Sequence, residues 1–322
     1  MFTNYYIDIQ DWYNISSKIN NTRNNVLSNN DELILDQVVL PQMLRCAQIK
    51  DQRRLTVRFS TCATDIIKQI FDRYKDYLII TSKIEHESVY KSIDGRQALF
   101  LDWNDIKHKQ FQQILQYIKN TQNRKIIFYV GQINFLTGQE VPNDLYKSFR
   151  HFALCNDIET IIVNDAVQQM FVGHCITECC DYIIGTAHSL IPKFNLGIVF
   201  CTKNNTIGFS DTYSGLEYIT KLIPISQYTN KILSFSDYIA QLLATQFSNR
   251  LDNHSWIYCS KITDNDYVSL KQLTKQTIHN SEIHLNMVCS QPVLRIRGTG
   301  PIYNRPAFES TFAIIYKYFR KE

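Results

Sequence analysis

Short runs of hydrophobic residues alternate with helical patterns along the first two thirds of the chain. Between residues 63 and 74, Ile66, Ile67, Ile70 and Phe71 recur at the spacing of one helix face. Further helices are predicted over 106–119 and 142–155, and strands at DYLIIT, ALFLDW, KIIFYVG, ETIIVND, CDYIIGTA and LGIVFCT. Strands this hydrophobic, with helices between them, are typical of a mostly parallel sheet buried between helical layers. We therefore predict a large α/β domain over residues 45–205.

After about residue 230 the pattern changes. Helices are predicted over 235–247, 266–278 and 307–319, and strands at WIYCS, IHLNMVC and VLRIR, of which the last two should pair. Helices that cover one face of a small antiparallel sheet form an α+β unit, and we predict one over residues 206–322. Residues 1–44, with the polar stretch NNTRNNVLSNND, form an N-terminal segment to which the pattern assigns no element.

Composition narrows the class of protein without naming a function. Hydrophobic residues make up 44% and charged residues 20% of the 322 residues, which excludes a disordered chain. The chain contains no run of eighteen apolar residues, and its start lacks a basic region followed by an apolar core, so we expect a cytoplasmic protein outside the membrane. The net charge of +4 comes without a dense Lys/Arg block, which argues against nucleic-acid binding.

The nine cysteines are an odd number in a long chain, which favours reduced thiols over a disulfide framework. The segment from His174 to Cys180 is rich in zinc-binding residue types, but it contains no C-x-x-C pair and has no second ligand cluster at zinc-finger spacing. We therefore expect packed thiols there and no bound metal.

Ligands of open α/β sheets bind beyond the carboxyl ends of the strands, so polar residues that follow a predicted strand are candidates for chemistry. Four segments meet this condition: the small-residue turn 60–64 that opens a helix, Glu85-His86, the turn 165–168 and the segment 186–189. The first could bind a phosphate, because a helix N-terminus carries free N–H groups and a positive dipole end. Each segment alone is more often a helix cap, a turn or a structural histidine than a binding site.

The order of these segments along the chain and their amino-acid sequences are more specific than any one segment alone. Residues 60–65 read S-T-C-A-T-D, residues 81–89 read T-S-K-I-E-H-E-S-V, and residues 165–168 read D-A-V-Q. Together they resemble the class V aminotransferase group of fold type I pyridoxal phosphate enzymes, which includes cysteine desulfurases and kynureninases. The family's phosphate turn is T-S-G-A-T-E, so Cys62 replaces its glycine. The resemblance runs from about Ser60 to Cys201 and returns at 295–304.

The resemblance implies a cofactor, pyridoxal phosphate or pyridoxamine phosphate, and a role for each matching residue. Cys62, Ala63 and Thr64 would hold the phosphate together with Thr186. His86 would stack on the pyridine ring and Asp165 would pair with the ring nitrogen. Gln168 would meet the ring hydroxyl, with Asn134 of INFLTGQEVP near it, and the implied cofactor-binding residues are thus Cys62, Ala63, Thr64, His86, Asn134, Asp165, Gln168, Thr186 and His188. The cofactor works as an electron sink, and a carboxylate beside the ring nitrogen keeps that nitrogen protonated.

The chain departs from the family at the residue that matters most. Thr186 and His188 match the first and third positions of the S-x-H-K motif, but Ser189 stands where the family has its Schiff-base lysine. A serine forms no covalent link to the cofactor and supplies no amine to carry the substrate proton. Lys193 lies four positions further on and, in a helical turn, would share a face with Ser189.

Three interpretations stay open. The protein could hold its cofactor noncovalently and still react, with His188 or Lys193 as the proton carrier; some sugar-modifying members of the fold use pyridoxamine phosphate with a histidine in place of the lysine. It could be a catalytically silent relative that keeps the pocket as a binding or partner subunit. Ser189 could also have been introduced on purpose to trap an intermediate.

The resemblance further implies an amino-acid substrate and a lyase or aminotransferase type of reaction. Arg297 aligns, without a gap, with the family's carboxylate-binding arginine, whereas Arg295 needs a two-residue insertion. Positions two apart on a strand share a face, so one arginine could bind substrate while the other packs nearby. A desulfurase needs a cysteine on a mobile loop, but Cys259 and Cys289 fall in predicted strands. Because fold type I pockets are completed across a subunit interface, we expect a homodimer.

Overall fold

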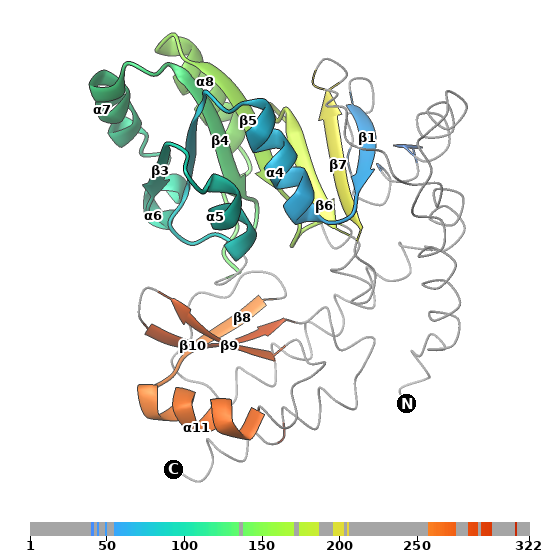
Figure 1. The fold of residues 1–322 in the computed structure, drawn as a ribbon, viewed down its shortest axis with the longest axis vertical. Coiled ribbons are helices and arrows are strands. Elements are labelled where there is room, and N and C mark those ends of the chain that lie inside the picture. Colours follow the sequence, from blue (N-terminus) through green and yellow to red (C-terminus); the bar gives the residue numbers. More distant parts are fainter. Residues whose placement is uncertain are drawn as a thin grey trace.

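A seven-stranded sheet forms the larger part of the structure (Figure 1). The computed structural model describes residues 40, 41, 44, 49, 55–134, 138–170, 174–186, 196–202, 205, 257–274, 283–288, 291–297 and 313. The strand order is β1-β7-β6-β5-β4-β2-β3. The strands are β1 (Leu55–Ser60), β2 (Leu78–Ser82), β3 (Ala98–Leu101), β4 (Lys125–Gly131), β5 (Glu159–Asp165), β6 (Tyr182–Thr186) and β7 (Gly197–Thr202).

The sheet is mostly parallel, as predicted. Strands β3, β2, β4, β5 and β6 pair in parallel, whereas β7 runs antiparallel to both of its neighbours, β6 and β1. The prediction of a parallel strand at LGIVFCT was therefore wrong in direction. Strand β1 was not predicted, because Arg58 interrupts its hydrophobic run; in the structure the Arg58 guanidinium donates to Thr56 Oγ1 at 2.8 Å and to the Val57 carbonyl at 2.9 Å.

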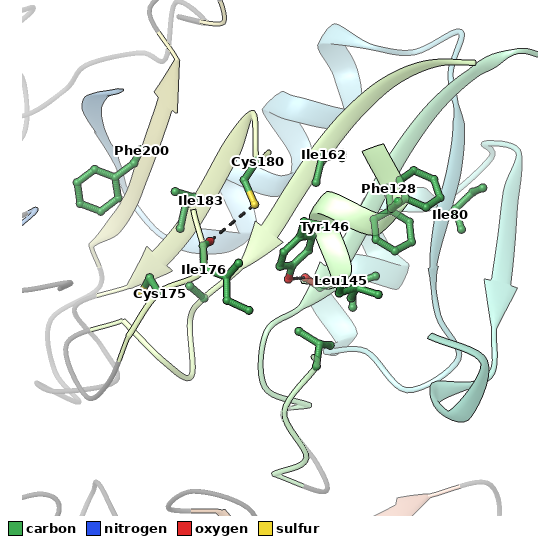
Figure 2. Packing of buried hydrophobic residues seen from close by; sticks show 14 of the residues in the cluster. Ile80, Phe128, Leu145, Tyr146, Ile162, Cys175, Ile176, Cys180, Ile183 and Phe200 are labelled. Carbon is green, nitrogen blue, oxygen red and sulfur yellow. Dashed lines mark hydrogen bonds between the residues drawn. The ribbon is translucent and has the colours of Figure 1, made fainter. Parts of the chain in front are cut away.

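Helices cover both faces of this sheet. Helices α4 (Ala63–Arg73) and α5 (Glu87–Ile93) bury Ile66, Phe71 and Val89 against one face. Helices α6 (Trp103–Lys107), α7 (Gln112–Thr121) and α8 (Leu145–Cys155) pack on the other face, where Tyr146 lies against Phe128 and the side chains of Cys175 and Cys180 join the same cluster (Figure 2). The predicted three-layer α/β architecture is confirmed.

Two predicted helices differ from the structure. The segment 106–119 is two helices, because Lys109 adopts a left-handed conformation with φ of 56° and ends the first. The resulting turn places Phe111 in the core, edge-on to Phe128 and Phe149. The helix predicted from residue 142 begins at Leu145 instead, after a turn in which the Leu145 N–H donates to the Pro142 carbonyl. By contrast, α4 and its four buried residues match the prediction.

The second sheet has three antiparallel strands in the order β8-β10-β9. Strands β9 (Ile283–Val288) and β10 (Gln291–Arg297) pair as predicted, β8 (Ile257–Lys261) pairs with the other edge of β10, and helix α11 (Asp264–Thr274) contacts β9 and β10. In Figure 1 this sheet lies beyond the edge of the large sheet at which α4 begins. The helix predicted over 235–247 lies outside the described residues, as does that over 307–319 apart from Ala313, which is helical.

Two residues of the N-terminal segment take part in the core: Leu40 and Leu44 are buried in the same cluster as Phe128. No helix in the described part of the chain combines the length and the hydrophobicity needed to cross a membrane.

Gly185 of β6 and Gly197 of β7 are each closely overlaid by another part of the chain; Gly185 pairs with Ile198, and Gly197 pairs with Thr186. A Cβ at Gly197 would lie 2.4 Å from the backbone carbonyl of Cys62, at the start of α4. A Cβ at Gly185 would instead meet the Met170 side chain, 2.0 Å from its Sδ. A flexible thioether can move aside, whereas a backbone carbonyl at a helix start cannot.

We therefore expect Gly197→Ala to lower the free energy of unfolding by about 1–3 kcal/mol, and Gly185→Ala by clearly less. Denaturant unfolding of both variants, with the slope checked for constancy, measures the difference. A Gly185→Ala variant as unstable as Gly197→Ala would contradict this account of the α4–β7 contact.

Candidate functional site

The candidate site lies at one edge of the large sheet. Because β1, β2, β4, β5 and β6 all run in the same direction, their last residues Ser60, Ser82, Gly131, Asp165 and Thr186 share that edge. The antiparallel β7 starts there, at Gly197. The sheet thus brings residues from distant parts of the sequence to one place.

The first group of candidate residues surrounds the N-terminus of α4. Gly197 is paired with both Ser60 and Thr186, and a Cβ on it would lie only 2.4 Å from the backbone carbonyl of Cys62, the N-cap residue. The first intrahelical bond of this turn runs from the Ile66 N–H to the Cys62 carbonyl at 3.4 Å. The N–H groups of the residues between them therefore have no partner within the helix. Thr64, the second residue of α4, is exposed.

The Thr186 hydroxyl lies beside this helix end, but its proton is already used. It donates to the Leu196 carbonyl at 3.0 Å, and the side chain is 8% exposed. That bond ties the end of β6 to the start of β7. The structure therefore gives Thr186 a structural bond where the sequence predicted a phosphate donor.

The second group surrounds Asp165 at the end of β5. Its Oδ2 accepts a hydrogen bond from the Tyr129 hydroxyl, and its Oδ1 accepts one from the Val167 N–H at 3.0 Å. The turn that follows is closed by the N–H groups of Gln169 and Met170, which both donate to the Ala166 carbonyl. Asp165 is partly buried, and its removal from water raises the pKa of its carboxyl, while the two hydrogen bonds and the nearby His86 lower it.

Gln168 in this turn carries an unsatisfied acceptor. Its Oε1 is buried and has no hydrogen-bond partner among the described residues. An orphaned buried amide oxygen costs free energy unless a ligand supplies a donor. This oxygen could therefore accept a hydrogen bond from a hydroxyl group of a ligand.

Glu85 and His86 join this group from the loop between β2 and α5. His86 is the N-cap residue of α5, where its Nδ1 accepts from the Ser88 N–H at 3.2 Å, and its ring is exposed. Glu85 is only 7% exposed, and its Oε1 accepts from the Gly131 N–H at 3.4 Å. Burial raises the pKa of Glu85 well above its ordinary value, and the negative charge of Asp165 raises it further.

Asn134 has a structural role in the arrangement. Its Nδ2 donates to the Ile84 carbonyl at 3.0 Å, and its side chain is 1% exposed. Asn134 thus joins the loop after β4 to the loop that carries Glu85 and His86, and its predicted place near the ring hydroxyl stays a prediction.

The remaining candidates are not placed in the site. His188, Ser189 and Lys193 lie outside the described residues. Arg295 and Arg297 occupy positions two apart in β10, the central strand of the small sheet. In the second group, Tyr129 was not predicted at all, and Glu85, although part of a candidate segment, was given no role. The sequence signal for Tyr129 was weak, since a tyrosine in a hydrophobic strand is ordinary core.

Known structures resemble this chain over almost its whole length. A NifS-like protein from Rickettsia africae superposes with a TM-score of 0.67 at 15% identity, covering 97% of each chain. The glutamate decarboxylase domain of a diaminobutyrate-pyruvate transaminase and L-2,4-diaminobutyrate decarboxylase from Vibrio parahaemolyticus gives 0.69 at 13% identity, over 96% of this chain and 78% of the other. A TDC from Oryza sativa, solved with PLP and tryptamine, gives 0.70 at 10% identity, over 97% and 81%.

The chain has the fold of the fold type I pyridoxal phosphate enzymes. No protein-family model matches it, and neither does any curated protein. At identities this low the likeness establishes the fold and leaves the activity to be argued from the site.

The residues at the edge of this fold type I sheet fit a phosphorylated pyridine cofactor. The open N-terminus of α4 suits a phosphate, and the carboxylate of Asp165 suits a protonated ring nitrogen. The Gln168 Oε1, which has no partner among the described residues, suits a hydroxyl donor, and the His86 ring is exposed. Only Thr186 fits less well than predicted, because its proton bonds Leu196.

The buried Glu85 gives the fold type I domain a pH-dependent stability. Because its pKa is raised in the folded state, the folded protein keeps a proton that the unfolded chain releases above the ordinary pKa of 4.5. The stabilisation from the neutral carboxyl is therefore fully present below that pH and is lost as the pH rises.

In Glu85→Gln we expect the free energy of unfolding to fall less steeply with rising pH, the slope changing by up to about 1.4 kcal/mol per pH unit. Unfolding free energies of parent and variant between pH 5 and pH 8 measure the slope. Glu87→Gln is the matched control, because Glu87 is an exposed glutamate two residues away that pairs with Lys91. An unchanged slope in Glu85→Gln would contradict a protonated Glu85.

Proposed function

We propose that the chain binds pyridoxal phosphate or pyridoxamine phosphate noncovalently and acts on an amino-acid substrate, as a lyase or aminotransferase. The observation that carries the proposal is the pairing, on one turn, of a doubly hydrogen-bonded Asp165 carboxylate with an orphaned Gln168 oxygen. A purely structural turn gains nothing from an unsatisfied buried acceptor. When bound, the cofactor supplies an electron sink for bond breaking at the substrate α-carbon.

The chain's own residues have separate tasks in this proposal. The N–H groups of Ala63 and Thr64 hold the phosphate at the positive end of α4. Asp165 holds the proton on the ring nitrogen, Gln168 Oε1 orients the ring by accepting from its hydroxyl, and His86 covers one face of the ring. Arg297 or Arg295 binds the substrate carboxylate.

Ser189 limits the reactions that the protein could catalyse. Without a lysine, no covalent link holds the cofactor, so affinity depends on the phosphate and ring contacts alone. The proton of the substrate α-carbon then needs another carrier, and His188 and Lys193 have the required chemistry. The same serine supports the alternative function, a catalytically inactive relative that retains the pocket as a binding or partner subunit. Turnover by the purified protein, with added cofactor and a panel of amino acids, separates the two.

Two wider expectations accompany this function. A homodimer remains a prediction, because the fold type I pockets that the sequence resembles are completed by a second subunit. A cytoplasmic location also remains a prediction from the sequence.

The phosphate site can be tested at Thr64. A glutamate suits the first turn of a helix, so Thr64→Glu should leave stability intact. Its carboxylate should nevertheless repel the phosphate and weaken binding of pyridoxamine phosphate by at least about tenfold. Thr64→Gln has the same size without the charge and should change affinity far less. Calorimetric titration with pyridoxamine phosphate, and with unphosphorylated pyridoxamine as a reference, measures this. Equal affinities for the Glu and Gln variants would place the phosphate elsewhere.

The absence of a reactive lysine can be tested at residue 189. Ser189→Lys should place an amine beside the cofactor aldehyde, so that borohydride treatment with pyridoxal phosphate labels residue 189 permanently. The parent protein should lose its cofactor on dialysis after the same treatment. Peptide mass mapping identifies the labelled residue. A label on Lys193 of the parent would show instead that a displaced lysine holds the cofactor.

A further inference from the structure

Tyr129 connects the core of the large sheet to the candidate site. It lies in β4, where its side chain is completely buried on the α4 side, and its hydroxyl donates to Asp165 Oδ2. Phe71 of α4 packs edge-on against its ring, with 5.5 Å between the ring centroids. Packing therefore fixes the position of the phenol, and the phenol hydroxyl holds the Asp165 carboxylate from the α4 side of the sheet.

Glu85 places a second carboxyl next to this pair. It bonds the N–H of Gly131, and Gly131 is the β4 residue that is paired with Asp165 across the β4–β5 ladder. Gly131 thus connects the two carboxyl-bearing residues, and neighbouring carboxylates in a poorly hydrated site resist ionising together. One negative charge is therefore shared by two acids, and their hydrogen-bond donors decide where it resides.

The donors favour Asp165. It accepts from the Tyr129 hydroxyl and the Val167 N–H, and His86 lies near enough to favour its charge. For Glu85 the corresponding bond is a single long one, at 3.4 Å from Gly131. Hydrogen bonds to an ionised carboxylate are stronger than those to a neutral one, so the charge resides on Asp165 and the proton on Glu85.

We propose that Tyr129 is a positioning residue that, with Glu85 as its neutral partner, fixes the negative charge on Asp165 and so sets how tightly the site holds a protonated ring nitrogen. This inference rests on the proposed function, because the ring nitrogen belongs to the proposed cofactor. Tyr129 touches neither cofactor nor substrate in this proposal and acts only through Asp165. Removing its hydroxyl leaves one carboxylate oxygen unbonded in the protein interior.

The test uses two probes that differ only at the ring nitrogen: pyridoxamine phosphate, and its carbocyclic analogue in which a C–H replaces that nitrogen. Tyr129→Phe should weaken binding of pyridoxamine phosphate by about 3- to 30-fold and leave binding of the analogue unchanged. In an Asp165→Asn background the same substitution should have no further effect. Calorimetric titration of the four proteins of this cycle gives the coupling.

Tyr146→Phe is the matched control. Tyr146 is equally buried, but it lies on the opposite face of the sheet, where its hydroxyl donates to the Val130 carbonyl and to Asn164 Oδ1 (Figure 2). It should lower stability without changing the affinity for either probe. Two results would overturn the proposal and leave Tyr129 with a structural role only. One is an equal loss of affinity for both probes in Tyr129→Phe. The other is a loss of affinity on Tyr129→Phe that persists in the Asp165→Asn background.

A measurement without cofactor separates the failure of this inference from the failure of the proposed function. In the infrared spectrum at neutral pH, the band of a protonated buried carboxyl should disappear in Glu85→Gln and remain in Asp165→Asn, and Tyr129→Phe should shift the carboxylate band of Asp165. The opposite assignment overturns the charge arrangement even if the cofactor binds. If the spectra agree but the parent binds neither probe, the charge arrangement stands, whereas the proposed function and the ring-nitrogen role of Tyr129 are both overturned.

Discussion

The structure of the candidate site depends on one buried negative charge, at Asp165. A carboxylate withdrawn from water is costly unless donors compensate it, and here they come from a strand tyrosine and from the turn that the aspartate itself begins. This requirement links β4, β5 and the Ala166–Met170 turn into one unit. Burial raises the pKa of the neighbouring Glu85 as well, and the negative charge of Asp165 raises it further.

The rest of the sheet supports this charge by bringing strand ends together. Five strands that run in the same direction (β1, β2, β4, β5 and β6) end at the same edge, and the antiparallel strand β7 begins there. Gly197 allows α4 to start in direct contact with β7, so a helix N-terminus lies at the same edge as Asp165. A positive helix end and a buried carboxylate are the two fixed charges that a phosphorylated, protonated pyridine requires, and the fold supplies both from backbone geometry and one side chain.

The sequence predicted the parts of this arrangement that are local. The segment 63–74 gave a correct helix because its hydrophobic spacing matches one helix face, and Asp165 was found because it ends a hydrophobic strand inside a recognisable motif. Strand β1 was not predicted because the charged Arg58 interrupts its hydrophobic run. In the structure, the Arg58 guanidinium donates to the carbonyl of the neighbouring Val57. The break at Lys109 depends on the burial of Phe111, which is a tertiary contact. Tyr129 and Glu85 could not be assigned because their role arises only when residues 85, 129 and 165 meet.

The serine at position 189 determines how the proposed cofactor would have to be held. Under the proposed function, no lysine at position 189 anchors the cofactor or moves a proton, so noncovalent contacts alone hold the ring. The structure puts a helix end, an orphaned amide oxygen and a reinforced carboxylate at that edge, which are contacts of the required kind. If the site had no ligand, its buried acceptor and the buried Glu85 beside Asp165 would reduce stability without any compensating gain. The unsatisfied acceptor at this edge therefore supports the proposal of reversible, noncovalent cofactor binding over the alternative of a site that has lost its ligand.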